Sequence, residues 1–433
     1  MELNQKRIVR AWSFYDWANS AYSLIITSAI FPAYFTAIIP EQVNLLGRNF
    51  HRDALASYSI SLSFLIIAFL SPILSSIADS RSNKKMFLRF FCYLGSLSCM
   101  ALFFFEKNTH GHVNLIYGLC CSILASIGFC GSLVFYNAFL PEIASKDQQD
   151  AVSANGFSMG YIGSVILMIF CFAFILADEQ LKWGLGSLPV RMSFVAVGIW
   201  WMGFAQITFA VLKEDALPKS GHHGSILFNG FQELKKVWHQ LKQIPVLKRF
   251  LFAFFFYNMG VLTVMYMATY FAGDALHMET TQLLSVILII QLVAIAGARL
   301  FAYLSQRWGN RQSLIVLVLI WICICIAAYK VVTVNQFYIL AFCVGMVMGG
   351  IQSLSRSTYS KLLPDTEDHA SFFSFYDVCE KLGIVIGTLS FGLISDYVGL
   401  RASALGLAVY FVIGLIGLFW MKDNFVRKSS GAQ

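Results

Sequence analysis

Residues 313–332 read SLIVLVLIWICICIAAYKVV, a run whose single charged residue is Lys330. An α-helix needs about 20 mainly apolar residues to cross the hydrocarbon core of a bilayer. Such runs recur along the chain at 17–39, 54–78, 86–105, 113–140, 154–177, 191–212, 250–272, 282–304, 313–332, 337–362, 371–394 and 401–421. The sequence therefore predicts an all-α membrane protein with twelve transmembrane helices.

The composition of the whole chain agrees with this prediction. Of its 433 residues 58% are apolar, 15% are aromatic and 12% are charged, and the mean hydropathy is +0.68. Soluble proteins average about 25% charged residues, so this chain cannot cover a water-facing surface. That excludes a soluble enzyme, a nucleic-acid-binding protein and a disordered scaffold. The ten cysteines lie in apolar runs and the eight histidines in polar connections. We therefore expect no disulfide framework, no metal site and no cofactor.

The basic residues predict the orientation of the spans. If the N-terminus is cytoplasmic, most of the 31 lysines and arginines fall on the cytoplasmic side once the sides alternate. This asymmetry follows the positive-inside rule. The net charge of +8 therefore reflects topology, and no nucleic-acid partner is needed to explain it. Both termini and residues 213–248 are predicted to be cytoplasmic.

The longest polar stretch divides the chain into two halves. We predict an N-terminal bundle at 1–212, a cytoplasmic linker at 213–248 and a C-terminal bundle at 249–433. The linker spaces its apolar residues for one helix face, which predicts a surface helix; these are Leu227, Phe231, Leu234, Trp238 and Leu241. The halves also echo each other, since Leu140-Pro141-Glu142 matches Leu363-Pro364-Asp365 at corresponding places. Such internal repeats are typical of transporters.

Several motifs carry a family resemblance. They are Tyr15-Asp16-Trp17-Ala18-Asn19-Ser20-Ala21-Tyr22-Ser23, Ala78-Asp79-Ser80-Arg81-Ser82-Asn83-Lys84-Lys85, Phe135-Tyr136-Asn137-Ala138-Phe139-Leu140-Pro141-Glu142, Gly349-Gly350-Ile351-Gln352-Ser353-Leu354-Ser355-Arg356-Ser357, and Phe375-Tyr376-Asp377 with Lys381. Together they resemble the vacuole-effluxer-like branch of the major facilitator superfamily, whose fungal members are autophagy-related vacuolar amino-acid exporters. The resemblance implies two pseudo-symmetric six-helix bundles around a cavity. Spans 1, 4, 7 and 10 would line it, and spans 2, 5, 8 and 11 would join the halves.

Polar side chains inside spans are the candidate site residues, because an ionisable group is costly in a bilayer. Those predicted to bind substrate or couple transport are Asn19, Tyr22, Asn137, Asn258, Gln291, Gln352, Arg356, Asp377, Glu380 and Lys381. Those predicted to act in gating are Asp16, Asp79, Arg81, Lys84, Glu142 and Arg299. A purely structural ion pair is the competing interpretation for Asp377 and Lys381. Arg299 and Arg356 could equally reach the membrane interface as topology anchors.

Two mechanisms follow from these residues. First, Asp79 is expected to dock at the start of span 11 near Ser371, where free backbone N–H groups favour an anion. Its neighbours Arg81, Lys84 and Lys85 would anchor the loop to anionic lipid.

Second, Asp377 is expected to pair with Lys381 four residues later, which leaves Glu380 to gain and lose a proton. On an alternative route, a substrate carboxylate takes the place of Asp377 on Lys381 and its amine binds Asp377.

The leading functional hypothesis is a secondary transporter of small polar solutes, with amino acids favoured by the resemblance. It would be a monomer in a bacterial cytoplasmic membrane, with a proton or cation as coupling ion. An efflux carrier of amphipathic or toxic compounds is the alternative within transport. A membrane-embedded enzyme acting on lipid-linked substrates is the alternative from another class, with Glu106, His110 and His112 as its nearest cluster. No GxxxxGK[ST] phosphate loop is present, which excludes an ATP-driven pump.

Overall fold

The computed structural model describes residues 2–45, 48–81, 83–107, 113–213 and 226–421. The first span is built of three helical segments, α1 (Lys6–Ala21), η1 (Tyr22–Ala29) and α2 (Ile30–Ile38). The other N-terminal helices are α3 (Arg52–Arg81), α4 (Lys84–Ala101) with η2 (Leu102–Phe104), α5 (Leu115–Ala138) with α6 (Leu140–Ile143), α7 (Gln149–Leu181) and α8 (Leu188–Val211). The C-terminal helices are α10 (Pro245–Leu276), α11 (Thr280–Trp308), α12 (Asn310–Lys330), α13 (Val334–Leu362), α14 (His369–Val398) and α15 (Leu400–Trp420), preceded by α9 (Ile226–Gln243).

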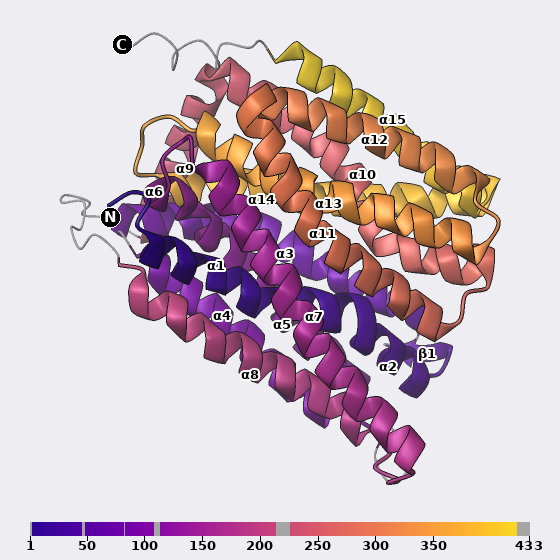
Figure 1. Cartoon of the computed structure of the whole chain (residues 1–433). Helices are drawn as coiled ribbons and strands as arrows, with labels where there is room; N and C mark the ends of the chain where they lie inside the picture. The colour runs from indigo at the N-terminus through magenta and orange to yellow at the C-terminus, as the bar shows by residue number, and fades with distance from the viewer. Residues whose placement is uncertain (1, 46–47, 82, 108–112, 214–225, 422–433) are drawn as a thin grey trace.

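Twelve helices of the described chain are long and apolar enough to cross a membrane, which confirms the predicted number. They form two bundles that lie side by side (Figure 1). In the N-terminal bundle α1 packs on α7 and α8, and in the C-terminal bundle α10 packs on α14 and α15. The bundles meet mainly where α3 contacts α14 and where α7 contacts α11 and α13. Spans 2, 5, 8 and 11 thus join the halves, as the resemblance implied.

The first span contains a π-helix that the sequence did not predict. In η1 the hydroxyl of Ser28 donates to the carbonyl of Ser23 at 3.0 Å, and the N–H of Ile30 donates to the carbonyl of Ile25. Hydrogen bonds that reach back five residues widen the helix, and such segments occur frequently at functional sites. A second unpredicted feature is the antiparallel hairpin of β1 (Gln42–Leu45) and β2 (Arg48–His51).

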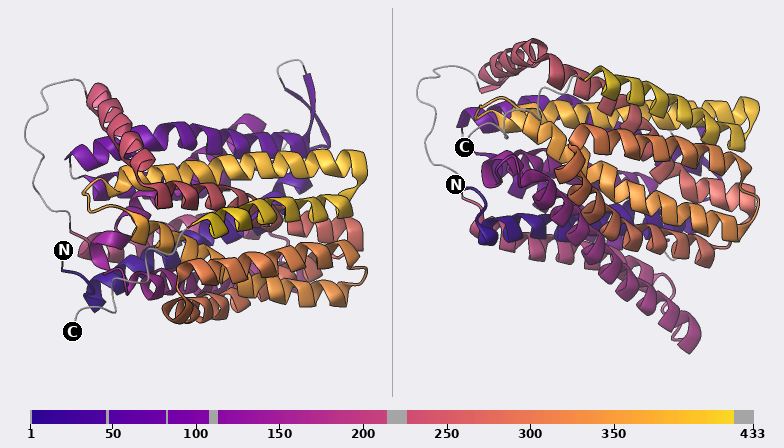
Figure 2. Two further views of the ribbon diagram at one scale, coloured as in Figure 1. Left: turned by 90° about the horizontal axis from the view of Figure 1, so that it is seen from above. Right: turned by 45° about the horizontal axis from the view of Figure 1, so that its top comes forward.

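The hairpin and the start of α1 mark opposite ends of the molecule. We call the end at which α1 begins the termini side and the end that carries β1 and β2 the hairpin side. Figure 2 shows α9 crossing the bundles at the termini side and the hairpin projecting from the other end. Long-range hydrogen bonds between the halves, described below, lie near the ends of α3 and α13 and the starts of α7 and α14, all on the termini side.

The linker helix α9 exists as predicted, but its packing differs from the predicted apolar stripe. Leu241 of the predicted stripe is buried at 4% exposure, but Trp238 of the stripe is 45% exposed and Val237, outside the stripe, is fully buried. The helix packs on α3, and Lys236 forms an ion pair with Asp368 at 3.2 Å next to the start of α14. The ring of Trp238 also lies 5.6 Å from that of Phe375. Because α9 contacts both bundles, its buried face is set by α3 and α14. The side chains of Leu227 and Phe231 lie outside the described residues.

Reporter fusions after residues 110, 230 and 430 test the predicted orientation. We expect an outside, an inside and an inside signal respectively, because lysines and arginines are retained on the cytoplasmic side. An outside signal at residue 230 would contradict the assignment of the termini side to the cytoplasm.

Candidate functional site

A cavity of about 420 Å³ lies between the bundles. Its walls come from the first span, α5, α10 and α13, as expected, with further residues from α3, α7, α11 and α14. It begins at Asp16 and Arg356 and extends along the first span to Pro32 and Thr36 toward the hairpin side. Nearly all predicted binding residues line it, namely Asn19, Tyr22, Asn137, Asn258, Gln291, Gln352, Arg356, Glu380 and Lys381. Asp377 is not among the lining residues.

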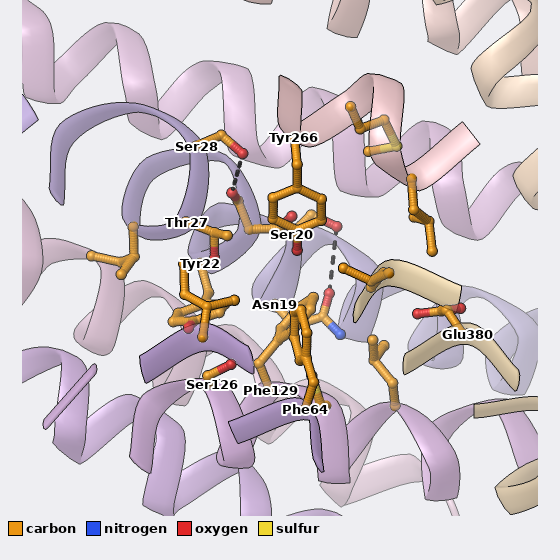
Figure 3. A pocket seen from close by; sticks show the side chains of 18 of the residues that line it. Asn19, Ser20, Tyr22, Thr27, Ser28, Phe64, Ser126, Phe129, Tyr266 and Glu380 are labelled. Atoms are coloured by element: carbon orange, nitrogen blue, oxygen red, sulfur yellow. Dashed lines mark hydrogen bonds between the residues drawn. The ribbon is translucent and has the colours of Figure 1, made fainter. Parts of the chain in front are cut away.

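Three amide side chains of the cavity wall have atoms without a hydrogen-bond partner among the described residues. They are Nδ2 of Asn19, Nδ2 of Asn258 and Oε1 of Gln291. A buried polar group without a partner costs free energy, so these atoms are suited to meet a polar ligand or water. Figure 3 shows Asn19 and Glu380 facing the same space from opposite bundles. Gln352 is different, because it accepts the hydroxyl hydrogen of Tyr161 at 2.6 Å.

Lys381 is the centre of a buried charge cluster on α14. Its Nζ lies 3.3 Å from Oδ1 of Asp377, which confirms the predicted pair, and 2.7 Å from Oε1 of Glu380. The lysine thus reaches both neighbours, and the expected role of Glu380 in gaining and losing a proton stays a prediction. Asp377 and Lys381 are 5% and 2% exposed, and Nζ lies 5.7 Å from the centre of the Phe64 ring on α3. Of the three charged residues in this cluster, Glu380 and Lys381 line the cavity and Asp377 does not. An amine in the cavity would therefore meet Glu380 rather than Asp377.

A second buried ion pair lies at the termini-side end of the cavity, which we call its floor, and joins the two bundles. We call it the floor pair: Asp16 of α1 and Arg356 of α13. The guanidinium donates to Oδ2 of Asp16 from Nη1 at 3.1 Å and from Nη2 at 3.2 Å. Tyr136 donates its hydroxyl hydrogen to the same oxygen at 2.8 Å. Arg356 is 3% exposed, so its side chain does not reach the membrane interface and does not act there as a topology anchor.

The other partners of Arg356 also belong to the N-terminal bundle. Its Nε and Nη2 donate to Oγ and O of Ser153, both at 2.9 Å, and Nη1 donates to Oδ1 of Asn137 at 3.3 Å. The guanidinium carbon lies 4.2 Å from the ring centre of Phe157 and 4.8 Å from that of Trp12. Arg356 thus projects from α13 into a pocket built by the opposite bundle.

A polar junction at the termini side was not predicted. Asp150 at the start of α7 accepts from Nζ of Lys361 at 2.6 Å, from Oγ of Ser305 at 2.8 Å and from Nδ2 of Asn310 at 2.7 Å. It therefore ties the N-terminal bundle to α11, α12 and α13. No local pattern connects Asp150 with these residues, which lie 155 to 211 positions further along the chain.

The predicted docking of Asp79 is confirmed. Its Oδ2 accepts from the backbone N–H and the hydroxyl of Ser371, both at 2.7 Å, and its Oδ1 accepts from the N–H of Ala370 at 3.2 Å. These donors belong to the first turn of α14, where N–H groups lack partners inside the helix. The contact joins α3 of one bundle to α14 of the other, and its role in gating stays a prediction.

The predicted lipid anchors next to Asp79 were wrong in two cases. Lys84 is buried and forms an ion pair with Glu142, whose Oε1 also lies 3.0 Å from Nδ1 of His369 at the start of α14. Lys85 donates to the carbonyl of Leu212 at 2.6 Å. Both ammonium groups find acceptors within the protein, so they do not depend on lipid. The side chain of Arg81 lies outside the described residues.

Arg299 is not brought together with the other residues that were predicted to act in gating. It is exposed on α11 and does not line the cavity. Ala298 and Ala302 form the buried face of this part of α11. Arg299 therefore lies on the outer face of the helix. His110 and His112 lie outside the described residues.

Replacing Asp79 by asparagine is expected to reduce transport at unchanged expression. The amide loses the charge that faces the first turn of α14, an interaction of about 1–2 kcal/mol when partly buried. Uptake into vesicles, normalised to the amount of protein, measures the effect. Asp147→Asn, in an exposed loop on the same side, is the matched control. Transport equal to that of the parent would remove Asp79 from the gate.

Comparison with known proteins places the chain among membrane transporters. The profile of the family described as "Vacuole effluxer Atg22 like" matches residues 4–429. The MFS-type transporter YxiO of Bacillus subtilis (strain 168) is 33% identical over 96% of this chain and 94% of its own length. Autophagy-related protein 22-1 of Aspergillus terreus (strain NIH 2624 / FGSC A1156) is 24% identical over 88% of this chain and 76% of its own length.

Solved structures give the same fold at low sequence identity. FucP in the outward conformation has a TM-score of 0.71 at 13% identity and covers 96% of this chain and 98% of its own. The human organic anion transporter MFSD10 has a TM-score of 0.72 at 11% identity and covers 96% of this chain and 100% of its own. FucP is described as a major facilitator superfamily transporter.

Proposed function

Since the chain belongs to the vacuole effluxer Atg22-like family of major facilitator transporters, we propose that it carries small polar solutes, with amino acids as the favoured class, by alternating access. It is a multi-pass membrane protein and not an enzyme, because its relatives and structural neighbours are transporters. The cavity between the bundles is the proposed transport path. The likeness to a Bacillus protein supports a place in a bacterial cytoplasmic membrane, where the protein would act as a monomer.

The chemistry of the cavity wall is the observation that carries this proposal. Unpartnered amide atoms of Asn19, Asn258 and Gln291 offer two donors and one acceptor. The carboxylate of Glu380, whose side chain is 26% exposed, offers an acceptor for an ammonium group. A purely apolar solute would leave these groups without partners, which disfavours its binding. A small solute with both donors and acceptors, such as an amino acid, meets them.

The function is tested first by comparing metabolites of a deletion strain with those of its complemented parent. The solute that changes should then enter liposomes that contain the purified protein, in unaltered chemical form. A solute that is chemically changed, or that crosses protein-free liposomes equally fast, would contradict a transport function.

Glu380 provides a test of coupling to protons. We expect Glu380→Gln to lose accumulation driven by a pH gradient while it retains exchange of solute for solute, because the amide cannot bind and release a proton. The matched control is Glu279→Gln, at the exposed start of α11. Parental accumulation in the Glu380 variant would assign coupling to another group.

A further inference from the structure

The floor pair lies where the solute cavity ends, and this position suggests a task beyond holding the bundles together. Asp16 and Arg356 both line the cavity, so a solute that reaches its floor meets the ion pair itself. We propose that a carboxylate group of the solute displaces Asp16 from Arg356, and that this exchange unlocks the termini side. The inference rests on the proposed function, because it concerns the solute that the cavity carries.

The pair must separate before the termini side can open. Asp16 moves with α1 and Arg356 with α13, and the hydrogen-bond and ring partners of the guanidinium described above belong to the N-terminal bundle. Withdrawing Arg356 without a new anion would leave a buried charge uncompensated, which is strongly unfavourable. A carboxylate from the solute supplies the same acceptor chemistry that Asp16 supplies. The charge of Arg356 then stays compensated while the bundles part.

The surroundings of Lys381, the other cationic residue of the cavity wall, favour Arg356 as the site that binds the solute carboxylate. Lys381 already contacts two carboxyl groups, those of Asp377 and Glu380, within 3.3 Å. A third carboxylate there would meet like charges, which disfavours it. Arg356 contacts one carboxyl group, and its planar fork of N–H donors suits carboxylates. The substrate route through Lys381 is therefore weaker than one through Arg356.

The two sites then divide the solute between them. An ammonium group would face Glu380, and a carboxylate would approach the floor, where the amide of Asn137 and the guanidinium of Arg356 lie. Once α1 has moved, water entering from the termini side hydrates Asp16, whose hydroxyl donor Tyr136 moves with the same bundle. A neutral or cationic solute cannot take over the role of Asp16. The predicted substrate class is solutes that carry a carboxylate.

The displacement of Asp16 from Arg356 can be followed by the rate at which a water-soluble reagent reaches a residue on the termini side of the floor pair. Ser360 lies one helical turn beyond Arg356 on α13, is 2% exposed, and its hydroxyl has no hydrogen-bond partner among the described residues. Ser360→Cys therefore removes no hydrogen bond from the described part of the chain. It places a thiol on the termini side of the floor pair. A water-soluble maleimide is added to the purified variant with a mixture of the seventeen amino acids other than cysteine, aspartate and glutamate, or with the matching mixture of their amides, which carry no carboxylate and no competing thiol. Protein without the added cysteine gives the background from native thiols.

We expect the amino acids to raise the labelling rate roughly tenfold, the amides to leave it unchanged, and Asp16→Asn to raise it without any solute. Asp147→Asn is the matched control for the loss of a carboxylate. Should Asp16→Asn reduce folded protein, the charge-balanced pair Asp16→Asn/Arg356→Gln replaces it, with the same expected high labelling and no response to amino acids. Equal responses to acids and amides, or unchanged labelling in the Asp16 variants, would overturn the proposal.

Transport measured in parallel separates this inference from the proposed function. If liposomes carry amino acids and amides equally well, the carboxylate exchange is wrong and the transport function stands. If liposomes carry neither mixture while Asp16→Asn still raises the labelling rate, the amino-acid assignment fails, and the exchange proposal fails with it.

Discussion

Replacing Lys381 by alanine is expected to abolish transport and to lower the amount of folded protein. The change leaves Asp377, which is 5% exposed, as a buried carboxylate without its cation. Breaking a buried ion pair from one side costs about 3–5 kcal/mol. It also removes the partner that holds Glu380 at the cavity wall. Solute uptake and thermal unfolding of the purified variant measure the two effects.

A double variant separates stability from transport at this cluster. In Asp377→Asn/Lys381→Met both charges of the pair are removed, so the folded amount should return toward that of the parent while transport stays lost. Lys330→Ala, at the exposed end of α12, is the matched control and should behave like the parent. Parental transport in the double variant would mean that the cluster is structural only.

Replacing Gly156 by alanine is expected to weaken the floor pair. A Cβ at this position of α7 would lie 2.4 Å from Oδ2 of Asp16 and 2.9 Å from Nη2 of Arg356, too close for either atom to stay in place. Overpacking of this kind costs about 1–3 kcal/mol, although alanine favours the helix itself by up to about 1 kcal/mol. We expect slower transport and faster maleimide labelling of the Ser360→Cys variant.

Gly203→Ala on α8 is the matched control for this change. Apart from its chain neighbours and the backbone of its own helix, no atom of the described residues would lie within 4 Å of a Cβ at this position, so only the gain in helix propensity remains. The control should transport like the parent. If Gly156→Ala does the same and labels no faster, the floor pair does not hold the termini side closed.

Hydropathy and charge were sufficient to predict the twelve spans, because each span needs an apolar run of fixed minimum length. The family resemblance, which implied that span 2 meets span 11, and the helix-terminus argument likewise predicted the contact of Asp79 with the first turn of α14. The π-helix of the first span was not predictable, since Tyr22–Ala29 lies inside a continuous predicted span and contains no glycine or proline that would set it apart. The domain boundaries at 212 and 248 stay predictions.

Partner choice between helices far apart in the sequence was harder to predict. Lys361 is one of the basic residues on the predicted cytoplasmic side, and nothing local connects it to Asp150, 211 residues away. Asp16 and Arg356 were predicted to act separately, one in gating and one in binding, because their separation of 340 residues hides their contact. Lys84 was read as a lipid anchor because its partner Glu142 lies on another helix. In each case the missing information was the packing of the bundles.

Counterflow in liposomes tests the central claim most directly, namely that the cavity moves a polar solute across the membrane unchanged. Liposomes with the purified protein are loaded with unlabelled amino acids, and labelled amino acids are added outside. We expect transient accumulation of unaltered label by the parent and by Lys330→Ala, and none by Asp377→Asn/Lys381→Met. Accumulation by the double variant equal to that of the parent, or label recovered in a chemically altered form, would contradict the account.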